Sequence, residues 1–250
     1  MLEGRRAVIT GGGTGIGLAC AEDLAKQGVH TVLMGRNLER LQAAADRIPG
    51  AQAVQLDVTD DTSVRNAFSH AYQDGAVDIL VNNAGIAAAS AFHKTTMEHW
   101  REIQAVNVEG LVRCTQAVID EMRKADYGRI INIASIAGIR GGAYMSPYVA
   151  SKHAVVGLTK SLSLEYAKSP LTVNAVCPGY VETAIVENSV ANIMEKTGRS
   201  RDEALAELTK NNPQGRLIQP EEVAETVTWL CSPRSASVCG QAITVAGGAI

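Results

Sequence analysis

The sequence lacks a long hydrophobic run. No segment has about 18 uninterrupted apolar residues, the length that a membrane-spanning helix needs. The first ten residues, MLEGRRAVIT, also lack the apolar core and the small-residue cleavage site of a secretory signal peptide. We therefore expect a cytoplasmic protein that has no membrane partner.

The sequence also lacks a block of positive charge. Its 23 basic residues face 26 acidic residues, which gives a formal net charge of −3. Domains that bind nucleic acid usually carry a basic patch or stripe. We therefore expect no nucleic-acid partner.

Cysteine and histidine are few and scattered. The five cysteines are an odd number without CxxC spacing, which argues against both a disulfide framework and a metal cluster. The five histidines form no pair at the helical spacing of metal ligands. We expect no catalytic metal, and we expect Cys177 to be a buried structural thiol.

The most informative stretch that is present runs from Arg129 to Lys152, RIINIASIAGIRGGAYMSPYVASK. It begins as a buried parallel strand, ends as a helix, and places Ser135 at the strand's end. Tyr148 and Lys152 are four residues apart and would share one helix face. A nearby ammonium lowers the pKa of a phenol, so Tyr148 is a candidate general acid/base. The alternative is an ordinary surface pair.

The start of the chain has the pattern of a phosphate-binding loop. A short strand over 5–10 is followed by glycines and then by a helical pattern over 18–28. Glycines there let the backbone approach a pyrophosphate at the N-terminus of a helix. The spacing of Gly11, Gly15 and Gly17 is GxxxGxG rather than GxGxxG, and an ordinary tight turn is the alternative.

The end of the second expected strand, over 30–34, bears on the cofactor. NAD-binding units usually carry an acidic residue there for the ribose 2′-hydroxyl, whereas this sequence has Arg36. Arginine binds phosphate through paired hydrogen bonds, so Arg36 favours NADPH over NAD. The alternative is a solvent-exposed Arg36 that begins the next helix, over 38–48.

Strands and helices alternate along the rest of the chain. This pattern predicts a single-domain, Rossmann-type, doubly wound α/β fold of about seven parallel strands, with helices on both faces. The charged segment 181–219 is expected to form a helical substrate lid. Further strands are expected over 53–58, 77–81, 130–134, 171–176 and 241–245, and further helices from about residue 60, over 95–124, from residue 148 and over 220–230.

Two polar residues in these elements have more than one explanation. Asp57 ends the third strand and could contact a cofactor or cap the following helix. Asn107 lies near the middle of the long helix, where asparagine is mildly unfavourable. It is therefore either exposed or distorts the helix for a functional purpose.

With these residues assembled, the sequence resembles the short-chain dehydrogenase/reductase family over essentially its full length. The pattern is most similar to β-ketoacyl and polyketide ketoreductases and to 3-hydroxyacid dehydrogenases. The markers are TGGGTGIG at 10–17, Asp57-Val58, NNAG at 82–85, Asn107, Ser135, Tyr148 with Lys152, and Pro178-Gly179 followed by Thr183.

The resemblance implies roles for the markers. Tyr148 would be the proton donor in reduction, and Lys152 would lower its pKa and hold the nicotinamide ribose. Ser135 would bind the carbonyl oxygen, and Asn107 would support a water that leads protons to Lys152. The implied cofactor contacts are Gly11, Gly15, Ile16 and Gly17 at the pyrophosphate, Asp57 and Val58 at the adenine, Asn83, Ala84 and Gly85 on the adenosine side, and Pro178, Gly179, Val181 and Thr183 at the nicotinamide.

The implied activity is hydride transfer from NADPH to a ketone. The expected substrate is a β-ketoacyl thioester, carried by coenzyme A or a carrier protein, or a polyketide-like ketone. An NAD-dependent 3-hydroxyacid or secondary alcohol dehydrogenase is the alternative, and a non-catalytic dinucleotide sensor is a remote one. Many NADPH-using members carry a basic residue where this chain has Thr14, so NADPH rests on Arg36. The family commonly forms homotetramers, which we expect here.

The expected lid is rich in basic residues. Some of them could meet a phosphate on coenzyme A or on a carrier-protein arm. The alternative is a solvated surface balanced by nearby acids. The basic residues are Lys196, Arg199, Arg201, Lys210 and Arg216, and the acids are Glu195, Asp202, Glu203 and Glu207.

Overall fold

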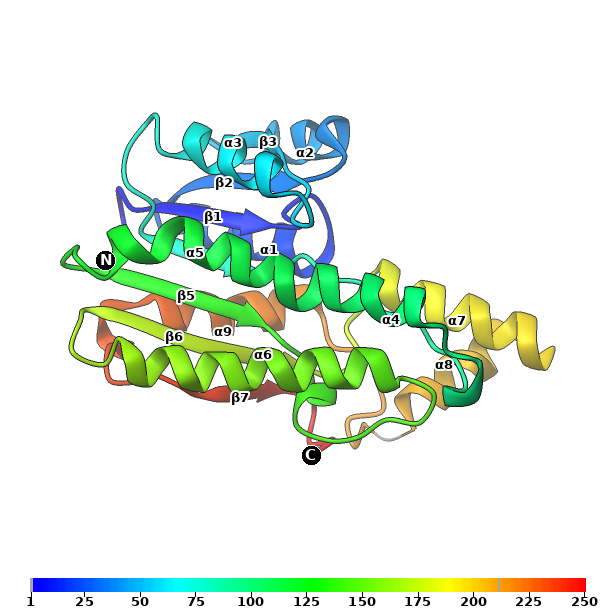
Figure 1. Ribbon diagram of the computed structural model, residues 1–250. Helices are drawn as coiled ribbons and strands as arrows, with labels where there is room; N and C mark the ends of the chain where they lie inside the picture. Colours follow the sequence, from blue (N-terminus) through cyan, green and yellow to red (C-terminus); the bar gives the residue numbers. More distant parts are fainter. Residues whose placement is uncertain (1, 211) are drawn as a thin grey trace.

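A seven-stranded parallel sheet forms the centre of the computed structural model, which describes residues 2–210 and 212–250 (Figure 1). The strand order is β3-β2-β1-β4-β5-β6-β7, and every neighbouring pair is parallel. This confirms the predicted doubly wound fold. The strands are β1 (Arg6–Thr10), β2 (His30–Gly35), β3 (Gln52–Gln55), β4 (Ile79–Asn82), β5 (Gly128–Ile133), β6 (Leu171–Pro178) and β7 (Ala242–Val245).

Helices cover both faces of the sheet. Successive residues of a strand point to opposite faces, so Ile9 and Ile131 join one apolar cluster while Val8 and Ile130 join the other. Helices α1, α2 and α9 contribute to the first cluster, and α3 and α5 to the second. The helices of these layers are α1 (Gly15–Lys26), α2 (Leu38–Ala45), α3 (Asp61–Ala71), α5 (Gly110–Met122), α6 (Ser146–Glu165) and α9 (Pro220–Cys231).

The remaining helices extend beyond the carboxyl-terminal edge of the sheet (Figure 1). They are α4 (Met97–Gln104), α7 (Ala184–Thr197) and α8 (Arg201–Thr209), with the short 3-10 turns η1 (Phe92–Lys94) and η3 (Ile136–Gly138). A further 3-10 turn, η4 (Pro233–Ser235), follows α9 near the starts of β5 and β6. None of the described helices is long and apolar enough to cross a membrane.

The long helix expected over 95–124 is interrupted. Between α4 and α5 the chain forms the π-helical segment η2 (Ala105–Glu109), which contains Asn107. Immediately after it, Gly110 packs on Val58 so closely that a Cβ atom would lie 2.6 Å from Val58 Cγ2. The third strand is also shorter than expected, because the N–H of Asp57 donates to Ser63 Oγ and the chain turns away from the sheet.

A buried polar chain crosses the middle of the sheet. Asn82 and Asn132 are register partners on β4 and β5, and Asn82 Nδ2 donates to Asn132 Oδ1 at 3.0 Å. Asn82 Nδ2 also donates to Thr115 Oγ1 of α5, and Asn132 Nδ2 donates to Thr159 Oγ1 of α6. These bonds tie both helices to the strands that carry the site.

Replacing Asn132 should therefore destabilise the fold. Asn132→Ala leaves a buried amide proton of Asn82 and the Thr159 hydroxyl without this partner, so we expect unfolding free energy to fall by about 2 to 3 kcal/mol. Urea unfolding checks this against Asn66→Ala, a substitution at an exposed helical position that should change stability by less than about 0.5 kcal/mol. Equal effects of the two substitutions would contradict the expectation.

Candidate active site

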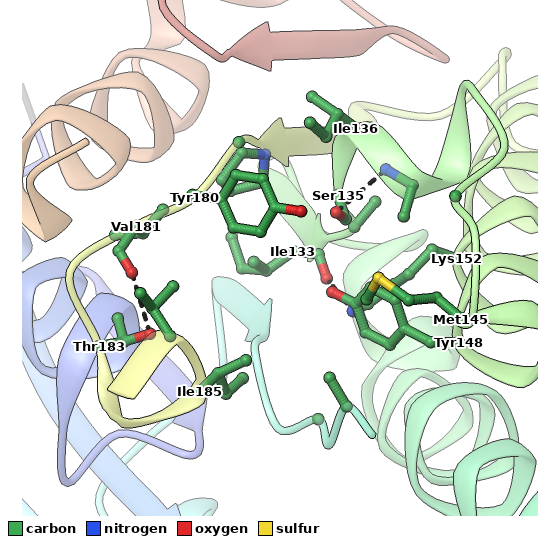
Figure 2. A pocket seen from close by; sticks show the side chains of 18 of the residues that line it. Ile133, Ser135, Ile136, Met145, Tyr148, Lys152, Tyr180, Val181, Thr183 and Ile185 are labelled. Carbon is green, nitrogen blue, oxygen red and sulfur yellow. Dashed lines mark hydrogen bonds between the residues drawn. The ribbon is translucent and has the colours of Figure 1, made fainter. Parts of the chain in front are cut away.

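A cleft lies at the carboxyl-terminal edge of the sheet, where doubly wound folds bind their ligands (Figure 2). It is lined by segments that follow β4, β5 and β6, together with the starts of α1, α6 and α7. The predicted site residues that line it are Ile16, Asn83, Gly85, Ser135, Tyr148, Lys152, Pro178, Gly179, Val181 and Thr183.

Ser135 lies two residues beyond the end of β5 and is buried. Its hydroxyl accepts the Ala137 N–H at 3.1 Å, so it caps η3. The turn is pressed against α6, because a Cβ atom on Gly138 would lie 2.6 Å from the main-chain oxygen of Lys152. Glycine at this position therefore sets the distance between the serine turn and the helix that carries Tyr148.

Tyr148 and Lys152 lie in the first two turns of α6. The helix begins at Ser146, and Pro147 follows in the first turn, where proline is favourable. Lys152 is buried, and its Nζ donates to the main-chain oxygen of Ile133 at 2.8 Å. The same Nζ lies 5.7 Å from the centroid of the Tyr148 ring. The structure thus brings Ser135, Tyr148 and Lys152 together (Figure 2).

The pKa of Tyr148 differs from the sequence-based expectation. Burial raises the pKa of this phenol, and the Ser135 side chain opposes the rise. The net shift is opposite to the expected lowering, because burial of the phenol outweighs the effects that favour the phenolate. The phenol is therefore protonated at neutral pH, the form that a proton donor needs. Burial lowers the pKa of Lys152 to about 8.

Asn107 is buried in the π-helical segment, so its exposed alternative is excluded. Its Oδ1 accepts the Ile86 N–H and its Nδ2 donates to the Ile86 carbonyl, both at 2.9 Å. Nδ2 also donates to Ser151 Oγ on α6. Asn107 therefore joins the loop after β4 to the helix of Tyr148, while its link to Lys152 through water stays a prediction.

The glycine loop has the shape that its sequence predicted. Gly11 and Gly15 have φ angles of 65° and 54°, in the left-handed region that favours glycine. A Cβ atom on Gly17 would lie 2.3 Å from the Gly11 oxygen. Asn83 Nδ2 donates to the carbonyls of Thr10 and Gly11, which holds the loop against the end of β4.

This loop fits the pyrophosphate of a dinucleotide. Helix α1 starts at Gly15, its N-cap Thr14 makes no side-chain capping bond, and its first turn has no acidic residue. Its first N–H groups and the positive end of its dipole are therefore suited to an anion. A Cβ atom on Gly15 would lie 3.0 Å from Thr183 Cγ2, so Thr183 approaches the loop from the opposite side.

Arg36, Asp57 and Val58 lie near the ends of β2 and β3. Arg36 is exposed, and its charge helps to lower the pKa of Asp57, although hydrogen bonds from Thr59 contribute more. Asp57 does not cap α3, because Asp60 does so. Ala84 follows Asn83, and its N–H donates to Thr10 Oγ1 at 3.0 Å.

Cys177 is fully buried, and burial raises its pKa to about 11, as a structural thiol requires. No group of three His, Cys, Asp or Glu side chains in residues 2–210 and 212–250 could hold a metal ion. The expectation that no metal takes part stays a prediction.

Several cleft residues were missed by the sequence interpretation. Tyr180 directly follows Pro178-Gly179, so its place could have been inferred from that motif. Arg140 belongs to the loop after η3, and no local pattern indicates its position. The cleft residues that were missed include Arg140, Met145, Tyr180 and Ile185.

The expected lid contains α7 and α8, which pack through Val186, Val190 and Ala204. Four of its five basic residues form ion pairs, which supports the alternative of a charge-balanced surface over phosphate binding. The pairs are Arg199–Glu207, Arg201–Glu187, Lys210–Glu207 and Arg216–Glu222.

A glycine loop suited to a dinucleotide pyrophosphate, beside a serine, a tyrosine and a lysine in one cleft, is the site of an oxidoreductase that acts on a carbonyl or an alcohol. The chain belongs to the short chain dehydrogenase family, which matches residues 5–193. The granaticin polyketide synthase putative ketoacyl reductase 1 of Streptomyces violaceoruber is 39% identical over 97% of this chain and 92% of that protein. The 3-oxoacyl-[acyl-carrier-protein] reductase of Aquifex aeolicus is 35% identical over 99% and 98%.

Other relatives extend the range of chemistry. A D-beta-hydroxybutyrate dehydrogenase of Rhizobium meliloti is 35% identical over 98% of both chains. A crystal structure of an actinorhodin polyketide ketoreductase variant with NADPH superposes with a TM-score of 0.95 at 37% identity. It covers 98% of this chain and 97% of that one.

The lowered pKa of Lys152 predicts a pH dependence. Its ammonium is charged below about pH 8 and loses the proton as the pH rises through that value. Because the family resemblance implies that this charge holds the nicotinamide ribose, we expect kcat/KM for NADPH to fall across this range. Initial rates from pH 6 to 10 measure it, with the exposed Lys160→Met variant as a control that keeps the wild-type profile. A flat profile between pH 7 and 9 would contradict this role for Lys152.

Proposed function

We propose that the protein reduces a ketone to an alcohol with NADPH. The proposed substrate is a β-ketoacyl thioester, on coenzyme A or a carrier protein, or a polyketide-like ketone. The observation that carries the proposal is the convergence of Ser135, Tyr148 and Lys152 in one cleft beside the glycine loop. The ketoacyl reductases among the relatives support it.

The residues divide the work on the carbonyl oxygen. Ser135 Oγ accepts the Ala137 N–H, so its own proton can be donated to the substrate oxygen. Tyr148, kept neutral by burial, transfers its phenolic proton to the same oxygen. The Lys152 ammonium stabilises the phenolate that results. NADPH, when bound, supplies the hydride.

The remaining predicted residues would hold the cofactor. Arg36 would bind the 2′-phosphate, and Asn107 would position α6 and the loop after β4 while supporting the water that leads to Lys152. The others keep their expected places: Gly11, Gly15, Ile16 and Gly17 at the pyrophosphate, Asp57 and Val58 at the adenine, Asn83, Ala84 and Gly85 on the adenosine side, and Pro178, Gly179, Val181 and Thr183 at the nicotinamide.

The lid of this single-domain enzyme would be the segment 181–219. Its two ends are pinned together, because Val181 and Ile218 form an isolated parallel bridge. The Glu182 N–H donates to the Ile218 carbonyl, and the Ile218 N–H donates to the Tyr180 carbonyl, both at 2.9 Å. Helices α7 and α8 lie between these ends, and the bridge holds Val181 in the cleft wall. A cytoplasmic homotetramer without nucleic-acid or membrane partners stays a prediction.

Tyr148→Phe should abolish turnover. The phenyl ring keeps the packing of α6 but has no proton to donate, so we expect kcat to fall by about 100-fold or more. Fluorescence titration should show NADPH affinity within about threefold of wild type. Tyr166→Phe, at the C-terminal end of the same helix, is the matched control and should retain activity. Retained turnover in Tyr148→Phe would remove Tyr148 from its role.

Arg36→Ala should separate the two nicotinamide cofactors. Loss of charge-assisted hydrogen bonds to the 2′-phosphate should raise KM for NADPH by roughly 10- to 100-fold and leave KM for NADH within about threefold. Initial rates with both cofactors measure this, and Arg65→Ala, at an exposed arginine of α3, is the control. A wild-type preference for NADH would favour the alternative function of an NAD-dependent hydroxyacid dehydrogenase. The hydroxybutyrate dehydrogenases among the relatives support that alternative.

A further inference from the structure

The charges around the cleft are unbalanced. Among the described residues that line it, the only charged side chains are Arg140 and Lys152, and none is acidic. The Lys152 ammonium is buried beside Tyr148 and donates to the Ile133 carbonyl. Arg140 is half-buried and contributes a second positive charge that the proposed proton transfer does not use.

Arg140 differs from the arginines of the lid. Arg199, Arg201 and Arg216 each pair with a glutamate. Arg140 takes part in none of the ion pairs formed within residues 2–210 and 212–250. Its one side-chain hydrogen bond there runs from Nη1 to the Ala249 carbonyl at 2.8 Å. A guanidinium has several further N–H donors, so most of its hydrogen-bonding capacity is left for a ligand.

The position of Arg140 is fixed relative to Ser135. Successive backbone bonds close the turn between them, from the Gly138 N–H to the Ser135 carbonyl at 2.8 Å and from the Arg140 N–H to the Ile136 carbonyl at 3.0 Å. Gly138 packs directly on α6, so this turn cannot shift without moving the helix. The other end of the side chain is held by the bond to Ala249. Arg140 is thus anchored at both ends on the wall of the cleft.

We infer that Arg140 binds an anionic oxygen group of the substrate, a carboxylate or a phosphate, while Ser135 and Tyr148 hold the ketone. An anion reaching Arg140 gains paired, charge-assisted hydrogen bonds without first displacing a carboxylate, whereas one reaching a lid arginine must break an ion pair. The inference rests on the proposed function, because it assigns the same cleft a substrate class: ketones that carry a negative charge.

Three substrates that share an acetoacetyl group test the inference. Acetoacetate has a carboxylate, acetoacetyl-coenzyme A has phosphates, and acetoacetyl-N-acetylcysteamine is a thioester with neither. Relative to wild type, Arg140→Gln should raise KM for at least one of the two anionic substrates at least about tenfold more than KM for the neutral thioester. An effect on acetoacetate alone identifies a carboxylate as the ligand, and an effect on the coenzyme A thioester alone identifies a phosphate.

Matched variants separate charge from structure. Arg140→Lys keeps the charge and should recover part of the loss, and Arg199→Gln, at a paired lid arginine, should match wild type. Added salt should raise KM for the affected anionic substrate, and this rise should be larger in the wild-type enzyme than in Arg140→Gln. Equal changes in KM for all three substrates, no change for either anion, or no recovery in Arg140→Lys would each overturn the inference.

Binding without turnover keeps this test independent of the reductase assignment. Acetoacetate and acetoacetyl-coenzyme A are titrated calorimetrically into NADPH-loaded Tyr148→Phe and into NADPH-loaded Tyr148→Phe/Arg140→Gln. For the anionic substrate that Arg140 binds, Kd should be at least about tenfold lower in the single variant than in the double variant. If wild-type enzyme reduces none of the three ketones while this difference appears, the proposed function fails and the anion site stands. Equal affinities in the two proteins overturn the anion site alone.

Discussion

The hydrogen bond from the Lys152 ammonium to the Ile133 carbonyl fixes the first turns of α6 against the end of β5. Ser135 follows β5 two residues later, and Tyr148 lies one turn before Lys152 on the helix, so this single bond relates the serine and tyrosine hydroxyls in space. Gly138 supplies the complementary contact, because only a residue without a Cβ atom lets η3 touch the helix backbone. The close packing of Gly138 on α6 and the charge-assisted hydrogen bond from Lys152 to Ile133 therefore together set the geometry of the site.

This arrangement buries polar groups that have to be satisfied. Lys152 loses hydration, which is why its pKa falls to about 8, and the Ile133 carbonyl provides partial compensation. Asn107 is satisfied in the same way by both main-chain groups of Ile86 and by Ser151. The buried polar chain through Asn82 and Asn132 ties the supporting strands to α5 and α6. The site thus has a rigid polar frame beneath it, which preserves the short distances that proton transfer needs.

The sequence predicted the features that depend on local pattern. Apolar runs located the strands, glycine spacing located the phosphate-type loop, and the Tyr148–Lys152 interval placed both side chains on one helix face. Asn107 indicated a distortion, although the π-helical form followed from its bonds to a loop about 20 residues away. The predicted direction of the Tyr148 pKa shift was wrong because the shift depends mainly on burial of the phenol, which a local sequence pattern does not show. The ion pairs of the lid could not be predicted from local sequence either, since Arg201 on α8 pairs with Glu187 on α7.

The two halves of the cleft are built from different parts of the chain. Proton transfer is assigned to the unit formed by β5, η3 and the start of α6, whose contacts tolerate little change. The opposite wall uses Tyr180, the bridge between Val181 and Ile218, and the segment around Ala249 that anchors Arg140. Loop and lid residues of this kind can vary without disturbing the buried frame. Substrate choice can therefore diverge among relatives that share one reaction. Arg140 connects the two halves, because its main chain closes the turn that follows Ser135 while its side chain bonds to Ala249 on the variable wall.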